Sequence, residues 1–297
     1  MLRRALELGI TFYDTADTYS DGGAETILPE AFPTQRDEIT IATKFGYDIY
    51  NSVADPSQRE RPQNWEPTYL RIAVEKSLER LKTDRIDFYQ MHNPRIDDLR
   101  RDDLLAELEA LKQEGKIRAY GATLGPAIND RQIEETAYIL EHTKMDAVQI
   151  IYNLFEQQIG APNFALAEKN GKGLLARVPH ASDLLLGRLN EKTTFAPGDH
   201  RNWRMTSNEA KRLWLDRGLL KVERIDFLTN NTGRTLGQAA LQYVLSHPSM
   251  VTVLPNIYDM PLLEELAAAS DVAPLSEAEL QMLNDLHEHD YYLEDVA

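Results

Sequence analysis

Four polar residues of this 297-residue chain lie where short apolar runs end, and their types suit acid–base chemistry. Asp14, Lys44 and His92 each end such a run, and Tyr19 follows five residues after Asp14. A lysine that ends an apolar run is partly buried and needs a counter-ion, which Asp14 can supply. An ammonium group beside a phenol lowers the pKa of the phenol from about 10, so Tyr19 can donate a proton near neutral pH. His92 can hold a substrate oxygen by hydrogen bonding.

Each of these residues also has an ordinary structural explanation. An aspartate at the end of a strand often caps a helix, and a lone lysine is usually a solvated charge. The chemical interpretation therefore depends on whether the elements between these residues bring the four side chains to one place.

The chain alternates between short runs typical of strands and longer runs with helical periodicity. The predicted strands are residues 10–13, 39–43, 87–91, 117–121, 147–152, 173–178 and 251–254. The predicted helices are residues 2–8, 25–32, 67–81, 104–114, 130–142, 163–170, 208–228, 236–246, 262–269 and 276–288.

This alternation predicts a mostly parallel sheet within a single domain over residues 1–297. A (β/α)8 TIM barrel fits best, and a doubly wound sheet is the alternative. Only seven strands are predicted, and the chain opens on a helix where a barrel should open on a strand. In a barrel, the strand-end residues would meet at the carboxyl-terminal mouth, where barrel active sites lie.

Two long loops, residues 45–66 and 179–207, follow predicted strands and so belong to the same mouth. Their aromatic side chains either line a substrate pocket or anchor the loops onto the barrel, and the sequence leaves both interpretations open. These aromatic residues are Tyr47, Tyr50, Trp65 and Trp203.

The composition excludes several classes of function. With 32 Lys and Arg against 48 Asp and Glu, the net charge of −16 disfavours binding to nucleic acid or to anionic membrane. The absence of cysteine excludes disulfides, thiolate nucleophiles and cysteine-ligated metals, and it fits a cytoplasmic location. We expect no signal peptide, no membrane span and no metal site, and we interpret residues 287–290 as a solvated helix end.

Seven segments, in this order, carry a resemblance to a known family: GITFYDTADTYSDGGAE (9–25), IATKFG (41–46), SLERLKTDRIDFYQMHNP (77–94), GKIRAYGATLG (115–125), VQIIYN (148–153), GRTLGQAALQYVL (233–245) and VLPN (253–256). The chain resembles the aldo-keto reductases over nearly its whole length. This resemblance implies a (β/α)8 barrel that binds a nicotinamide dinucleotide without a Rossmann domain. It also implies hydride transfer between that cofactor and an aldehyde, a ketone or an alcohol.

The catalytic tetrad of that family falls on Asp14, Tyr19, Lys44 and His92. The resemblance implies that Tyr19 protonates the carbonyl oxygen, that Lys44, paired with Asp14, tunes Tyr19, and that His92 orients the carbonyl. It also implies that the chain lacks the family's first barrel strand.

The implied cofactor-binding residues match the family less closely. Thr123 can replace the family's serine hydroxyl, but Leu124 cannot replace the asparagine that follows it, and Gln149 matches a glutamine that binds the carboxamide. Arg177 stands where an aromatic side chain usually stacks on the nicotinamide. The segment that covers the pyrophosphate matches Val178, Pro179, His180 and Arg188, the last as a phosphate contact.

The resemblance implies NADP(H) as the cofactor, whereas residues 254–265 indicate a weakened preference or NAD(H). This stretch has no basic residue, and Asn256 replaces the usual Gly or Lys. Asp259 would repel a 2′-phosphate, and either Asp259 or Glu265 can accept a hydrogen bond from a free ribose hydroxyl. Two arginines elsewhere remain candidates for compensation: Arg201 and Arg234.

Two alternative functions remain beside the reductase. The first is a catalytically weak relative that senses cofactor or regulates a partner, and the complete tetrad argues against it. The second is a barrel lyase with Lys44 as a Schiff-base residue, and Asp14 argues against it by holding Lys44 protonated. The partner in the favoured interpretation is a small carbonyl or alcohol. The substrate, the reaction direction and the oligomeric state stay open.

Overall fold

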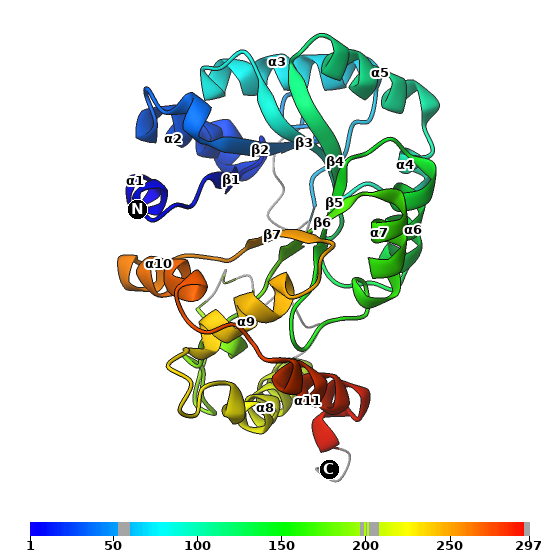
Figure 1. Ribbon diagram of the computed structural model, residues 1–297. Helices are drawn as coiled ribbons and strands as arrows, with labels where there is room; N and C mark the ends of the chain where they lie inside the picture. Colours follow the sequence, from blue (N-terminus) through cyan, green and yellow to red (C-terminus); the bar gives the residue numbers. More distant parts are fainter. Residues whose placement is uncertain (53–59, 197–198, 200, 202–207, 294–297) are drawn as a thin grey trace. The chain divides into compact units, whose positions relative to one another are not determined.

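The computed structural model describes residues 1–52, 60–196, 199, 201 and 208–293 (Figure 1). The chain divides into two compact units, the first formed by Met1–Ile150 with Pro162–Leu174 and the second by Ile151–Ala161 with Leu175–Ala297. Among the described residues, one sheet of seven strands runs in chain order from β1 to β7. This order agrees with the predicted strand–helix alternation and with the predicted number of strands.

The first unit contributes five parallel strands, and their register explains how distant residues come together. Register partners on neighbouring strands include Lys44 with Gln90, His92 with Thr123, and Thr123 with Gln149. These strands are β1 (Phe12–Asp14), β2 (Thr40–Phe45), β3 (Ile86–His92), β4 (Ile117–Thr123) and β5 (Ala147–Ile151).

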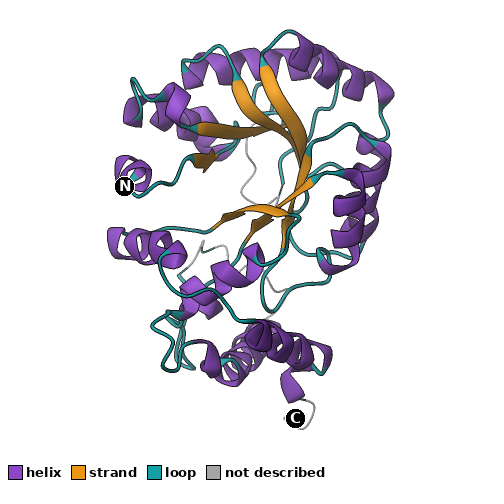
Figure 2. Cartoon of the chain, viewed as in Figure 1, coloured by secondary structure: helices purple, strands orange, loops and turns teal. Residues whose placement is uncertain are grey.

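The helices of this unit lie outside its strands (Figure 2). Helix α3 (Pro67–Leu81) begins with a proline at its first turn, and its buried residues recur every three or four positions, as in Leu70, Val74 and Leu78. This apolar face packs on β2. The remaining helices are α1 (Leu2–Glu7), α2 (Gly23–Ala31), α4 (Ile96–Leu99), α5 (Asp102–Gln113), α6 (Arg131–His142) and α7 (Phe164–Asn170).

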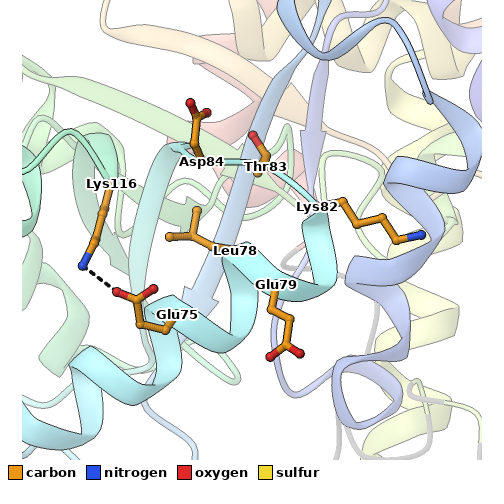
Figure 3. A pocket seen from close by; sticks show the side chains of 7 residues that line it. All are labelled: Glu75, Leu78, Glu79, Lys82, Thr83, Asp84 and Lys116. Carbon is orange, nitrogen blue, oxygen red and sulfur yellow. Dashed lines mark ion pairs between the residues drawn. The ribbon is translucent and has the colours of Figure 1, made fainter.

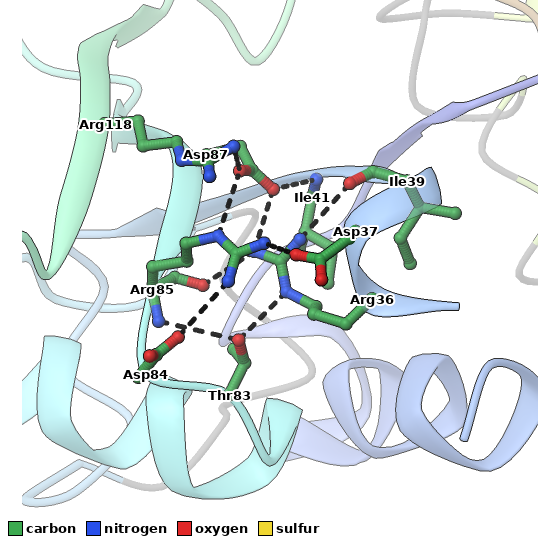
Figure 4. Close-up of polar contacts among 9 residues, drawn as sticks. All are labelled: Arg36, Asp37, Ile39, Ile41, Thr83, Asp84, Arg85, Asp87 and Arg118. Carbon is green, nitrogen blue, oxygen red and sulfur yellow. Dashed lines mark hydrogen bonds and ion pairs between the residues drawn. The ribbon is translucent and has the colours of Figure 1, made fainter. Parts of the chain in front are cut away.

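A network of ion pairs joins the amino ends of β2, β3 and β4 around the buried carboxylate of Asp87 (Figure 4). Asp87 pairs with Arg36 at 2.8 Å and with Arg118 at 3.0 Å, and it accepts a hydrogen bond from the Ile41 backbone at 2.9 Å. A buried charge is stable only when it is paired and hydrogen-bonded, and these contacts provide both for Asp87. The Asp87 carboxylate therefore has a structural role, which is to hold the three strands together.

A surface pocket opens at the same end of the strands (Figure 3). It is lined by the end of α3, by the turn into β3 and by Lys116, which pairs with Glu75 at 2.5 Å. Acidic and basic side chains both line this pocket, and none of the predicted catalytic residues does. The amino-terminal face of a barrel usually serves stability, so we assign this pocket no chemistry. The lining residues are Glu75, Leu78, Glu79, Lys82, Thr83, Asp84 and Lys116.

The second unit contains β6 (Gly173–Arg177) and β7 (Met250–Leu254). Helix α9 (Leu236–Leu245) begins with a capping box in which Thr235 and Gln238 satisfy each other's backbone groups. Its Leu241 packs with Leu262 and Leu266 in a small apolar core. The other helices are α8 (Asn208–Arg224), α10 (Met260–Ala267) and α11 (Glu277–Glu288), the last preceded by a capping box of Ser276 and Glu279.

The structure differs from the predicted elements mainly at their ends. Strand β2 continues through Lys44 to Phe45, and β3 includes His92 as its last residue, because both strands stay buried to these points. The four-residue helix α4 was not predicted, since it buries only Leu99. No helix among the described residues is long and apolar enough to cross a membrane.

Candidate catalytic site

A buried ion pair between Lys44 and Asp14 forms the base of the candidate site. The Lys44 side chain is 1% exposed, and its Nζ donates to the Asp14 carboxylate and to the Thr15 carbonyl oxygen at 2.7 Å. Removing an ammonium ion from water costs several kcal/mol, which its pairing must offset. A lysine at position 44 is therefore tolerated only because Asp14 provides a carboxylate beside it.

Tyr19 begins a short 3₁₀ helix, Tyr19–Gly22, whose next two residues, Ser20 and Asp21, both have a φ of 52°. This turn places the Tyr19 ring centroid 5.3 Å from Lys44 Nζ and 6.0 Å from the His92 ring, which meets it edge-on. Tyr19 is 44% exposed, whereas Lys44 and His92 are buried. The structure thus brings Lys44 and His92 beside a phenol that incoming molecules can reach.

His92 is held by residues of the loop that follows β2. The ring of Tyr47 lies edge-on at 4.8 Å, and Gln63 Nε2 donates to the His92 carbonyl oxygen at 2.8 Å. The Tyr47 hydroxyl bonds to Glu60 and accepts from Asn93 Nδ2 at 2.7 Å. Burial raises the pKa of Tyr47, and the Glu60 carboxylate raises it further. Tyr47 therefore stays protonated at neutral pH.

The aromatic residues of this loop act as anchors. Trp65 is buried and meets Phe45 edge-on at 5.7 Å, while the Tyr50 hydroxyl accepts from Arg80 Nη1 at 3.1 Å. Arg61 forms an ion pair with Asp21 at 2.5 Å, two residues after the candidate proton donor. Of the two roles left open for these aromatics, the structure shows anchoring for Tyr47, Tyr50 and Trp65. Trp203, named with them, lies outside the described residues.

Two buried amide side chains bind the second oxygen of Asp14, and a buried threonine hydroxyl supports one of them. Its Oδ2 accepts from Gln90 Nε2 at 2.9 Å and from Gln149 Nε2 at 3.0 Å. The Thr123 hydroxyl donates to Gln90 Oε1 at 2.7 Å. Thr123 and Gln149 were predicted as cofactor contacts, whereas Gln90 was missed. The signal for Gln90 was available, because it is a polar residue inside a strand in which all seven residues are buried.

The remaining predicted cofactor residues lie in the second unit. After β6 the backbone of Val178 has a φ of 58°, which is rare for a β-branched residue, and its carbonyl oxygen accepts from Asn153 at 2.9 Å. Arg177 is half-buried, and Pro179 and His180 are buried. His180 Nε2 bonds to the Gly237 carbonyl oxygen at 3.2 Å, so this ring holds the loop to α9.

Arg188 pairs with the two carboxylates that were predicted as alternative acceptors for a ribose hydroxyl, of which Asp259 was also predicted to repel a phosphate. It is 3.6 Å from Asp259 and 3.8 Å from Glu265. Asp259 also caps α10 through the Leu262 amide at 2.8 Å, and Glu265 accepts from the Thr235 hydroxyl at 2.7 Å. Asn256 is exposed after β7.

The two arginines proposed to compensate are themselves paired with carboxylates. Arg201 binds Asp183 at 2.7 Å and also Asp199, and the buried Arg234 pairs with Glu279. Arg234 thus serves the packing of α11. No cluster of three metal-binding side chains occurs in the part of the chain that the structure describes.

The buried side chains of Thr123 and Gln149 suit a ligand with an amide group, because each has an oxygen that can accept a directed hydrogen bond in a site shielded from water. This chemistry fits the carboxamide of a nicotinamide. Residues 1–288 match the model of the aldo/keto reductase family.

Among curated proteins, the chain is 30% identical to the uncharacterized oxidoreductase YqkF of Bacillus subtilis, over 98% of this chain and 88% of that protein. It is 27% identical to the NADH-specific methylglyoxal reductase of Escherichia coli, over 94% of this chain and 84% of that protein.

Solved structures give the same result. The holo form of aldo-keto reductase AKR11C1 from Bacillus halodurans matches with a TM-score of 0.76 and 30% identity, over 96% of this chain and 86% of that one. An aldo/keto reductase from Klebsiella pneumoniae, solved with NADP and acetate, matches with a TM-score of 0.68 and 26% identity, over 96% and 83%. These likenesses confirm the predicted (β/α)8 barrel fold, of which the described residues supply seven strands.

Proposed function

Because the chain belongs to the aldo-keto reductase family, we propose that Asp14, Tyr19, Lys44 and His92 are its catalytic residues. The protein is an oxidoreductase that transfers hydride between a nicotinamide cofactor and an aldehyde, a ketone or the corresponding alcohol. The observation that carries the assignment of residues is the buried Lys44 ammonium, which lies between the Asp14 carboxylate and the Tyr19 ring.

Each side chain has one task in this proposal. A reduced nicotinamide, when bound, supplies the hydride that the carbonyl carbon receives. The Tyr19 hydroxyl donates a proton to the carbonyl oxygen, which becomes the alcohol. Lys44 stabilises the negative charge that remains on Tyr19, and Asp14 fixes Lys44 in place. His92 holds the carbonyl oxygen by a hydrogen bond, and its buried ring is kept in position by Tyr47.

The variant Tyr19→Phe tests this assignment. Loss of a general acid typically lowers turnover by about 10²- to 10⁴-fold, while cofactor affinity should stay nearly unchanged. The matched control is Tyr120→Phe, which removes a hydroxyl that donates to Glu109 at 2.6 Å outside the site. Turnover of an aldehyde panel by Tyr19→Phe at the rate of the control would contradict the role of Tyr19.

We further propose that the cofactor preference is weak, with NADPH favoured over NADH by less than about tenfold, which equals about 1.4 kcal/mol. The support is the position of Arg188, whose charge is already shared by Asp259 and Glu265. The relatives differ in this respect, since one was solved with NADP and another is named as NADH-specific. Dissociation constants for both cofactors, measured by fluorescence at one salt concentration, test the proposal, and a hundredfold preference for NADPH would contradict it.

We also propose that residues 1–297 form one catalytic domain, supported by a family model that spans residues 1–288. The remaining proposed contacts of the second unit with the dinucleotide are Arg177, Val178, Pro179, His180 and Asn256. We propose a cytoplasmic location and only small-molecule partners, supported by the cysteine-free, acidic sequence. Cell fractionation tests the location.

A further inference from the structure

Gln90, to which the proposed reaction gives no role, occupies the centre of a buried polar network. It lies in β3 with none of its surface exposed. Its Nε2 donates to Asp14 Oδ2 at 2.9 Å, and its Oε1 accepts from the Thr123 hydroxyl at 2.7 Å and from Gln149 Nε2 at 3.1 Å. One amide thus joins Asp14, the residue that holds Lys44, to Thr123 at the end of β4 and to Gln149 in β5.

These bonds fix which atoms of Thr123 and Gln149 remain for a ligand. An amide nitrogen carries two hydrogens, and Gln149 gives one to Asp14 and one to Gln90. A threonine hydroxyl carries one hydrogen, and Thr123 gives it to Gln90. Gln149 therefore offers only its carbonyl oxygen, and Thr123 only its lone pairs. Both groups act as acceptors toward anything that binds beside them.

We propose that Gln90 is a positioning residue that holds Thr123 and Gln149 as acceptors for the N–H groups of the cofactor's carboxamide. The proposal rests on the proposed function, since it presumes that a nicotinamide binds beside Asp14 and Lys44. Without Gln90, the Thr123 hydroxyl can rotate, and the Gln149 amide keeps its bond to Asp14 but has its second N–H free, so each can donate as readily as it accepts. Selectivity for a ring substituent that donates hydrogen bonds is then lost.

The experiment compares the oxidised nicotinamide dinucleotide with its 3-acetylpyridine analogue, whose acetyl group keeps the carbonyl oxygen but has no N–H. Dissociation constants come from quenching of tryptophan fluorescence. For the unaltered protein we expect the analogue to bind about tenfold more weakly, the effect of one or two net hydrogen bonds. For Gln90→Met, which keeps the side-chain length without polar atoms, we expect the two constants to agree within about threefold.

The matched control is Gln132→Met, because Gln132 is also a buried glutamine of the first unit but lies in α6, with its Oε1 accepting from the Asn129 amide at 3.2 Å. This variant should keep the tenfold ratio between the dissociation constants of the analogue and the nicotinamide dinucleotide. In Gln90→Asn, which keeps the amide but shortens the side chain, this ratio should fall as it does in Gln90→Met. Gln90→Asn replaces Gln90→Met in the test if the methionine variant does not fold.

The outcomes separate the two proposals. Failure of the unaltered protein to bind either dinucleotide would overturn the proposed function and this inference with it. Equal affinity of the unaltered protein for both dinucleotides would overturn the inference alone. So would an unchanged tenfold ratio in Gln90→Met or Gln90→Asn when the unaltered protein reduces aldehydes normally.

Discussion

Replacing Lys44 by methionine should slow carbonyl reduction by an amount that follows from its distance to Tyr19. The ammonium lies 5.3 Å from the Tyr19 ring centroid. Two unit charges at that distance interact with about 3 kcal/mol at an effective dielectric constant of about 20, and with about 0.8 kcal/mol in bulk water. Because Tyr19 is 44% exposed and Lys44 is buried, we expect the interaction energy to lie between these two figures. The turnover number should therefore fall by about 4-fold to about 200-fold.

The single variant leaves the Asp14 carboxylate, 13% exposed, without its cation. Removing one partner of a buried pair typically costs about 3–5 kcal/mol of stability. We therefore expect Lys44→Met to lower the urea midpoint strongly, and the double variant Asp14→Asn with Lys44→Met to recover most of that loss. Both variants should show the same drop in turnover, because each lacks the ammonium beside Tyr19.

The assay is steady-state oxidation of reduced nicotinamide with a saturating aldehyde, at a temperature where each variant is folded. Lys172→Met is a matched control, since Lys172 is a partly buried lysine whose Nζ donates to carbonyl oxygens of Ile139 and Thr143 at 2.8 and 2.5 Å, outside the site. Turnover by the double variant within threefold of the unaltered protein would refute the electrostatic role of Lys44.

Three further predictions concern stability and its dependence on pH. Burial raises the pKa of Asp17 above its ordinary 3.8, and the neighbouring Glu25 raises it further, so folding favours its protonated form. The contribution of protonated Asp17 to the free energy of unfolding is complete below about pH 4 and is lost as pH rises through its pKa in the folded protein. The stability of Asp17→Asn relative to the unaltered protein should therefore increase from pH 4 upward in urea titrations. A difference that does not vary with pH would count against this account. Burial lowers the pKa of His180 below 6.5, so its contribution to the free energy of unfolding is present above pH 6.5 and is lost as pH falls. His180→Gln should therefore reduce the dependence of the free energy of unfolding on pH below 6.5. An unchanged dependence on pH in this variant would disprove the account. Gly121→Ala should cost about 1–3 kcal/mol or more, because the added Cβ would overlap the Ala147 carbonyl oxygen; a thermal midpoint equal to that of the unaltered protein would show that β4 can shift.

The sequence predicts best those elements whose signals are local. Helix α3 has the predicted bounds because Pro67 marks its start and its apolar residues keep one period to Leu81. Helix α4 was missed because four residues show no periodicity. The grouping of Asp14 with Lys44 also follows from local signals, since both end runs that a parallel sheet places side by side.

The parts that the sequence did not predict depend on register and on competition among partners. Gln90 bonds to Asp14 across 76 positions of the chain, and only the register of β2 with β3 shows that the two meet. Arg234 was a reasonable phosphate ligand by residue type, but its guanidinium group forms an ion pair with Glu279. A charge pattern states which groups can pair, whereas the folded structure decides which of them do.

The loop after β2 has a consequence for the way such enzymes diverge. Its described residues fasten to both sides of the candidate site, through Arg61 to Asp21 and through Gln63 to the backbone of His92. Segments that select substrates usually vary freely because a rigid scaffold carries the reactive groups. Here the loop also supports the reactive groups of the scaffold, so changes made in it to accept a new substrate should alter turnover as well. We therefore expect a loop grafted into this chain from a relative to preserve turnover only when it keeps Arg61 and Gln63, which bind Asp21 and the His92 backbone.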